Sequence, residues 1–172
     1  MTAKDGGKAV TIYTDGACIG NPGPGGYGVV VMYKGHRREH SGGFRLTTNN
    51  RMEMLAVIVG LESLKERCQV TVFSDSQYVV NAITKGWARK WKANGWRRAS
   101  NEKALNPDLW ERLLTLCDKH GVEFRWVRGH DGNKENERCD YLATTAAAEA
   151  ATGVDGVYEA LVKGSGARAK LL

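Results

Sequence analysis

Four acidic residues lie far apart in the chain, each in a short segment with unusual neighbours. They are Asp15 in YTDG, Glu53 in NNRME, Asp75 in FSDS and Asp140 in NERCD. Asp15 and Asp75 end or interrupt apolar, strand-like runs, where a carboxylate is costly to bury unless a cation pairs with it. Mg²⁺ prefers oxygen ligands and takes one or two carboxylates per ion. The four acids are therefore candidate ligands of a divalent metal.

Each of these acids also has a purely structural interpretation. The pattern Asn50-x-x-Glu53 fits a capping box at a helix N-terminus. Asp75 is compatible with an N-cap, and Asp15 before a glycine is compatible with a turn. Asp140 is compatible with a single exposed charge on a helix. Taken one at a time these interpretations are as good as a metal site, and only the surrounding segments favour the metal.

Length and composition indicate one globular domain. The chain has 172 residues, of which 42% are hydrophobic and 26% charged, an ordinary balance for a folded protein. No apolar run approaches the roughly 18 residues that span a bilayer, and the first residues lack a secretory apolar stretch. The four cysteines form no Cys-x-x-Cys pair, which favours reduced thiols over zinc ligands, and Cys139 is expected in the core. We expect a cytoplasmic monomer without membrane contact.

A basic segment at about residues 85–103 carries the charge of the chain. It holds seven lysines and arginines and one glutamate, which accounts for the whole net charge of +6. Such a cluster indicates a polyanionic partner. Trp87, Trp91 and Trp96 interleave with the cations, and Trp87 and Trp91, four residues apart, share a helix face. We interpret these rings chiefly as a small core that anchors the segment while the cations face phosphates.

The hydrophobic pattern predicts a mixed sheet covered by helices. A glycine- and proline-rich loop at 16–26 and a turn at 34–36 join the first three strands into an antiparallel meander. A fourth strand, apolar or β-branched throughout, is expected to be buried on both faces. If the first and fourth strands are neighbours, Asp15 and Asp75 lie side by side. The predicted strands are 9–14, 27–33, 37–46, 70–73 and 122–127, and the predicted helices are 49–67, 76–83, part of 85–103, 107–116 and 135–151.

The four acids and their neighbours lie in longer segments, which are YTDGACIGNPGPGGYG (13–28), TTNNRME (47–53), SDSQYV (74–79) and VRGHDGNKENERCD (127–140). Together these segments resemble the bacterial type 1 ribonuclease H family. The resemblance runs from about Val10 to Ala151 and implies an α/β, ribonuclease H-like fold. That fold has a five-stranded mixed β-sheet, three antiparallel strands followed by parallel additions, flanked by helices. Three features depart from the pattern: Arg128 where relatives often carry lysine, an insertion-like Gly86, and a tail with several glycines.

The resemblance also implies an activity. It implies an endonuclease that hydrolyses the RNA strand of RNA–DNA hybrids by two-metal-ion catalysis and leaves 5′-phosphate and 3′-hydroxyl ends. The family's metal ligands fall on Asp15, Glu53, Asp75 and Asp140, and its catalytic-loop histidine falls on His130. The metal would be Mg²⁺, two ions per site with substrate, with Mn²⁺ as an alternative. We hypothesise that Asp15 bridges both ions, that Glu53 and Asp75 hold the ion near the leaving oxygen, and that Asp140 holds the other.

Contacts with the hybrid are assigned by the same resemblance. The 2′-hydroxyls would meet Cys18, Asn21, Asn50 and Gln77, whereas Thr48 and Asn49 lie at a helix N-terminus that suits a DNA phosphate. The basic protrusion, about residues 85–103, would grip the DNA strand. Its contact candidates are Trp87, Arg89, Lys90, Trp91, Lys92, Arg97 and Arg98. The remaining histidines, His36, His40 and His120, are expected at the surface.

The chain is divided into a catalytic domain, residues 1–151, and a C-terminal extension, residues 152–172. We expect the first half of the extension to pack through Val157, Tyr158 and Leu161, and the residues after about Lys163 to be mobile and partly disordered.

Two other functions compete with a hybrid ribonuclease. A non-catalytic hybrid-binding module would predict the loss of a carboxylate, and all four are present. A nuclease of the same broad fold acting on DNA would not need the basic, tryptophan-rich segment together with Asn49 and Asn50.

Overall fold

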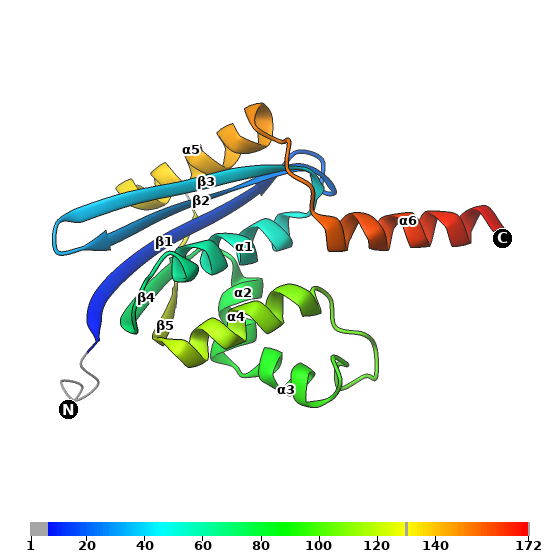
Figure 1. The fold of residues 1–172 in the computed structure, drawn as a ribbon, viewed down its shortest axis with the longest axis horizontal. Coiled ribbons are helices and arrows are strands. Elements are labelled where there is room, and N and C mark those ends of the chain that lie inside the picture. Colours follow the sequence, from blue (N-terminus) through cyan, green and yellow to red (C-terminus); the bar gives the residue numbers. More distant parts are fainter. Residues whose placement is uncertain (1–6, 130, 172) are drawn as a thin grey trace.

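The computed structural model describes residues 7–129 and 131–171, with side chains described as far as Gly164. Five strands form one sheet in the order β3-β2-β1-β4-β5, with β1, β2 and β3 antiparallel and β4 and β5 parallel to β1 (Figure 1). The predicted five-stranded mixed sheet is therefore confirmed. The strands are β1 (Lys8–Cys18), β2 (Gly23–Tyr33), β3 (His36–Thr47), β4 (Cys68–Ser74) and β5 (Gly121–Trp126).

Helices cover the sheet unequally. Figure 1 shows α5 alone on one face and α1, α2 and α4 on the other, with α3 at the periphery. The main core lies between the sheet and α1 and α4, where Ile12, Val72, Ile58 and Leu113 are fully buried. None of the described helices is long and apolar enough to cross a lipid bilayer. The helices are α1 (Asn49–Glu62), α2 (Gln77–Thr84), α3 (Trp87–Ala93), α4 (Pro107–Lys119), α5 (Lys134–Glu149) and α6 (Gly156–Leu171).

The strand β4 is buried on one face only, so the prediction of burial on both faces is wrong. Its burial alternates, with Val70 and Val72 in the core and Phe73 half-buried on the opposite face. There Phe73 stacks on Tyr13 of β1, with ring centroids 5.1 Å apart. The reason is the placement of α5, which packs on β1, β2 and β3.

Much of the expected glycine loop is strand. β1 continues to Cys18, and β2 begins at Gly23. Glycine is required here because α5 packs directly on the backbone: a Cβ at Gly26 would collide with the Ala143 carbonyl, and one at Gly28 with the Cys139 carbonyl. Cys139 is fully buried against this surface, as predicted.

Two expectations at element ends are also wrong. The helix expected to reach Arg67 ends at Glu62, because Ser63 caps it and donates its hydroxyl to the Gly60 carbonyl (2.6 Å). His120, expected at the surface, is only 2% exposed. It follows α4, and its Nδ1 accepts the backbone N–H of Cys68 at the start of β4 (3.0 Å). Burial lowers the pKa of His120.

The C-terminal extension attaches through its backbone and polar groups rather than through its apolar residues. Val157 and Leu161 are exposed, and Tyr158 is half-buried, so packing through all three is not observed. Gly153 bonds instead to the edge strand β3, accepting from Arg45 N (2.9 Å) and donating to Gly43 O (3.0 Å). From there α6 projects away from the sheet (Figure 1). The division of the chain at residue 151 and the mobility beyond Lys163 stay predictions.

Candidate active site

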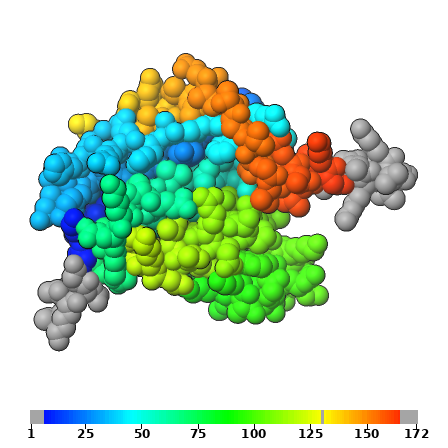
Figure 2. Space-filling view, viewed as in Figure 1, coloured from blue at the N-terminus to red at the C-terminus, as the bar shows by residue number. Residues whose placement is uncertain are grey.

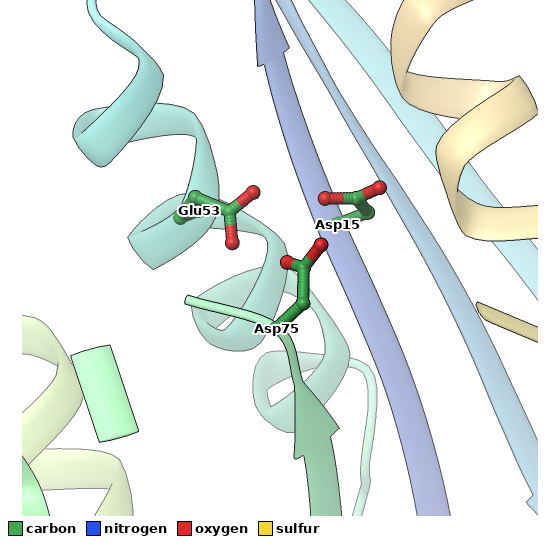
Figure 3. A group of neighbouring side chains, drawn as sticks. All are labelled: Asp15, Glu53 and Asp75. Atoms are coloured by element: carbon green, nitrogen blue, oxygen red, sulfur yellow. The ribbon is translucent and has the colours of Figure 1, made fainter. Parts of the chain in front are cut away.

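Three of the four candidate carboxylates converge from different elements. Asp15 lies on β1, Glu53 on α1 and Asp75 directly after β4, and their side chains point toward one another (Figure 3). Each offers an oxygen within 4.8 Å of the others. The parallel pairing of β1 with β4 places Tyr13 opposite Phe73. Asp15 and Asp75, each two positions further along the chain, therefore lie side by side. Strand register thus creates the site.

Glu53 does not form a capping box. The N-cap of α1 is Thr48, whose hydroxyl accepts the Arg51 N–H (3.2 Å). Glu53 lies in the second turn and points at β1 instead, where its Oε1 accepts the Gly16 N–H (2.7 Å). Its Oε2 is buried and has no hydrogen-bond partner within the described residues. A buried carboxylate oxygen without a hydrogen-bond donor is compatible with a cation site.

The structural interpretations of the two aspartates are wrong as well. Asp15 is no turn residue, since it lies within β1 and pairs with Gly28 of β2. Asp75 is no N-cap, because Ser76 caps α2 and accepts the Val79 N–H (3.2 Å). The backbone carbonyl of Asp75 accepts the indole N–H of Trp126 (3.0 Å). Both carboxylates therefore face the site (Figure 3), where Asp15 Oδ1 also accepts the Gly16 N–H (2.8 Å).

Asp140 lies on α5, which covers the opposite face of the sheet from α1, and it borders the same site. It is outside the group of three but shares a small cavity of about 10 Å³ with Asp15 and Asp75. Asn136, one helical turn earlier, also lines this cavity, and its Oδ1 is buried without a partner in the described part of the chain. We did not assign Asn136 from the sequence, although its spacing from Asp140 was the available signal. The cavity has room for about one water molecule.

The electrostatics of the cluster favour an added cation. Burial, together with the neighbouring carboxylates of Asp75 and Asp140, raises the pKa of Asp15 to about 7. Burial and the Asp15 carboxylate raise the pKa of Glu53 well above its ordinary value, and burial and Asp140 raise that of Asp75. Carboxylates that resist ionisation in this way become fully charged when a divalent ion binds between them. The oxygen-only donor set fits a hard ion such as Mg²⁺.

A groove joins the carboxylates to predicted hybrid contacts. We call it the carboxylate groove. It has a volume of about 400 Å³ and is lined by Asp15, Gly16, Asn49, Asn50, Glu53, Asp75, Ser76, Gln77, Tyr78 and Asp140. Tyr78 also lines a second hollow of about 630 Å³ together with Trp87, Trp91 and Arg98 of the basic protrusion. Tyr78, which we did not assign from the sequence although SDSQYV contains it, connects the two.

The other predicted hybrid contacts lie beside the groove. Asn21 accepts the Asn49 N–H through Oδ1 (3.0 Å), and Thr48 is the N-cap of α1. Cys18 is half-buried, with its thiol directed at the carbonyls of Gly23 and Thr47.

In the basic protrusion the core interpretation holds for two of the three tryptophans. Trp91 packs edge-on against Trp110 at 6.1 Å, and Trp96 is half-buried against the same core. Trp87 is 40% exposed, with the Lys85 ammonium 5.2 Å above its ring, so it does not anchor the segment.

Several cations of the protrusion pair with acids. Arg89 pairs with Asp118 of α4 (2.8 Å), Lys92 with Glu111 of α4 (2.9 Å), and Arg98 with Glu102 (3.7 Å). All of these groups are substantially exposed, so each pair is weak and opens readily to a phosphate. Lys90 and Arg97 are exposed too.

His130 lies outside the described residues. The preceding residue, Gly129, brings the loop backbone against the cluster: a Cβ there would lie 2.8 Å from Asp75 Oδ2. The loop that carries the histidine therefore starts at the carboxylates.

Comparison with known proteins decides the family. The family model described as RNase H matches residues 7–148. The chain belongs to the ribonuclease H family. It is 68% identical to a ribonuclease H of Syntrophus aciditrophicus (strain SB) over 156 residues, which cover 91% of this chain and 90% of that protein.

Solved ribonucleases H share the fold. LC9-RNase H1, described as a type 1 RNase H with the type 2 active-site motif, superposes with a TM-score of 0.74 at 36% identity, covering 90% of this chain and 81% of the other. LC11-RNase H1, solved in complex with an RNA/DNA hybrid, has a TM-score of 0.60 at 27% identity, covering 81% and 97%. The identification of a bacterial type 1 ribonuclease H from the four segments is confirmed.

Proposed function

We propose that this ribonuclease H cleaves the RNA strand of RNA–DNA hybrids endonucleolytically, with Asp15, Glu53, Asp75 and Asp140 as ligands of Mg²⁺. The observation that carries the metal assignment is the buried, unpartnered Oε2 of Glu53 beside two further carboxylates whose pKa values are raised. Membership of the ribonuclease H family and the likeness to a hybrid-bound relative support the substrate.

The four carboxylates differ in their exposure to solvent. Glu53 is buried and Asp15 nearly so, whereas Asp75 and Asp140 are half-buried at the mouth of the groove. Divalent ions held by these carboxylates would supply an activated water and would stabilise the charge on the phosphate. Asp15, which neighbours Glu53 and Asp75 and shares a cavity with Asp140, would contact both ions, and Asp140 would help hold the ion that activates water. Attack of water on phosphorus with departure of the 3′-oxygen gives 5′-phosphate and 3′-hydroxyl ends.

His130 is assigned a proton-transfer role by its place in the loop after Gly129. Imidazole titrates near neutral pH, which suits the exchange of a proton with solvent during turnover. Its removal should slow turnover without abolishing it, since the metal ligands remain.

Hybrid recognition is assigned to the carboxylate groove and its borders. Asn50 and Gln77 share the groove with the carboxylates and would contact sugars of the RNA strand, with Cys18 and Asn21 alongside. The N-terminus of α1 at Thr48 and Asn49 would hold a DNA phosphate, and the basic protrusion would follow the DNA strand. All these residues come from one chain, so we expect a monomer to be active.

A strand-labelled hybrid tests the proposal. With Mg²⁺, the wild-type protein should cut only the RNA strand at internal positions, and excess chelator should stop cleavage. Asp15→Asn should lower the rate by about 100-fold or more, because one central metal ligand is lost. Cleavage of an all-DNA duplex would favour the DNA nuclease, and unchanged cleavage in chelator would reject the metal site.

A further inference from the structure

The carboxylate of Asp155, in the C-terminal extension, is 9% exposed and fully engaged. Its Oδ2 accepts the hydroxyl of Thr47 (2.7 Å) and Nε–H of Arg51 (2.7 Å), and its Oδ1 accepts from Nη2 of Arg51 (2.9 Å). The backbone bonds of Gly153 to β3 hold this segment in place two residues earlier. In Figure 2 the orange segment lies against the cyan end of β3. A buried, bidentate ion pair of this kind has favourable hydrogen-bond geometry, and removing one partner is strongly destabilising.

Arg51 is 2% exposed and completes the link to a third element. Its two Nη groups also donate to Asp108 of α4 (2.7 and 3.0 Å), and Nη1 reaches Asn106 Oδ1 (3.3 Å). All three guanidinium nitrogens are thus bonded. The bonded N–H groups of the guanidinium point at carboxylate or amide oxygens, so the Arg51 side chain is held in one conformation.

The two residues that Asp155 holds enclose the start of α1. Thr47 precedes the N-cap Thr48, and Arg51 lies in the first turn, between Asn50 and Glu53. The same short stretch supplies Asn49, Asn50 and Glu53 to the carboxylate groove. Glu53 in turn reaches Gly16 N at 2.7 Å, a contact that a small shift of the turn would break.

We infer that Asp155 is a positioning residue: through Thr47 and Arg51 it holds the first turn of α1 so that Glu53 and the asparagine pair stand in the groove. The inference rests on the proposed roles of those three residues in metal and hybrid binding. It gives the extension a part in catalysis although the family match stops at residue 148. A residue with a purely structural role would change stability and leave the binding of Mg²⁺ and hybrid unaltered.

The test compares full-length variants well below their melting temperatures. Asp155→Asn keeps the shape of the side chain and removes the charge that fixes Arg51. It should raise both the Mg²⁺ concentration for half-maximal rate and the KM for hybrid by about tenfold, less than the roughly 100-fold cost of a 1 Å misplacement. Thr47→Val, which deletes only the hydroxyl bonded to Asp155, should shift both in the same direction by a smaller factor.

Glu159→Gln is the matched control. Glu159 also ties the extension to β3, through a 2.8 Å pair with the exposed Arg45, and has no described hydrogen bond or ion pair to α1. The Glu159→Gln variant should keep the Mg²⁺ concentration for half-maximal rate and the KM for hybrid within about twofold of wild type.

If Asp155→Asn has the wild-type Mg²⁺ concentration for half-maximal rate and the wild-type KM for hybrid, the inference is overturned, even if the melting temperature is lower. If Asp155→Asn does not fold, Thr47→Val decides by the same criterion. A wild-type protein that cleaves in chelator, or a Glu53→Gln protein with normal Mg²⁺ dependence, would instead overturn the proposed metal site, so the two failures are distinguishable.

Discussion

At the scale of residues, the site is built from acids in surroundings that oppose their charge. Glu53 is buried and Asp15 nearly so, and each is close to another carboxylate. Such an arrangement destabilises the metal-free protein at neutral pH, because the folded state must either hold a proton or bear the repulsion. Function and stability therefore conflict at these positions.

The pH dependence of metal-free stability should show this conflict. The pKa of Asp15 is raised from 3.8 to about 7, so the folded state binds this proton more tightly than the unfolded state. Its contribution to stability is thus present below about pH 4 and is lost as the pH rises through about 7. In chelator at pH 7.5, Asp15→Asn should be more stable than wild type by roughly 1–4 kcal/mol, as measured by thermal or urea unfolding.

The same comparison at pH 4.5 should give a much smaller difference. Glu149→Gln, which removes an exposed acid at the end of α5, should show no such gain at either pH. A wild-type protein whose metal-free stability rises between pH 4.5 and 7.5 relative to Asp15→Asn would contradict the prediction.

At the scale of elements, the position of Asp140 depends on how closely α5 approaches the sheet. Gly28 pairs with Asp15 across β1 and β2 and lies beneath the Cys139 carbonyl. The contact of a helix backbone with a strand backbone brings the carboxylate that follows Cys139 to the groove. The small side chains of Ala143 and Ala146 continue this close packing.

Gly28→Ala should therefore affect both folding and chemistry. The added methyl meets backbone that cannot rotate away, so we expect a loss of about 3 kcal/mol in the free energy of unfolding. Because α5 moves outward with Asp140, kcat should fall at temperatures where the variant is fully folded. Unfolding by urea and single-turnover cleavage measure the two effects.

Gly164→Ala provides the control, since a Cβ there meets nothing within 4 Å. Alanine in a helix should be neutral or slightly stabilising. If Gly28→Ala were as stable and active as this control, the close approach of α5 would not matter for the site.

The sequence predicts the site better than it predicts the contacts that hold it. The register of β1 and β4 and the four short segments suffice to bring Asp15, Glu53 and Asp75 together. Local patterns mislead at Glu53, where Thr48 caps the helix, and at His120, whose burial depends on packing between distant elements. The pair of Arg51 with Asp155 joins residues 104 positions apart, and no local spacing indicates such a partner.

At the scale of the whole molecule, charge is concentrated on one side of the active site. The basic protrusion carries seven cations and one acid, so its net charge equals the +6 of the whole chain. Trp87, Trp91 and Arg98 line the hollow that joins the protrusion to the groove through Tyr78. A polyanionic duplex is drawn to such a surface mainly by release of its counterions.

Hybrid affinity should therefore fall steeply with salt. In fluorescence anisotropy titrations, the double variant Lys90→Gln/Arg97→Gln should lower the slope of log affinity against log salt by about 1–2, with weaker binding for every sequence. Lys163→Gln, on α6, should leave the slope unaltered. Equal slopes for all three proteins would exclude the protrusion from the binding surface.

The hydrogen bond from Trp126 to the Asp75 carbonyl gives the molecule a native optical probe. The indole is 45% exposed, and its only described polar bond ends on the backbone of a proposed metal ligand. Indole emission is sensitive to such a bond and to solvent, so cation entry should change the part of the tryptophan emission that a Trp126→Phe protein lacks.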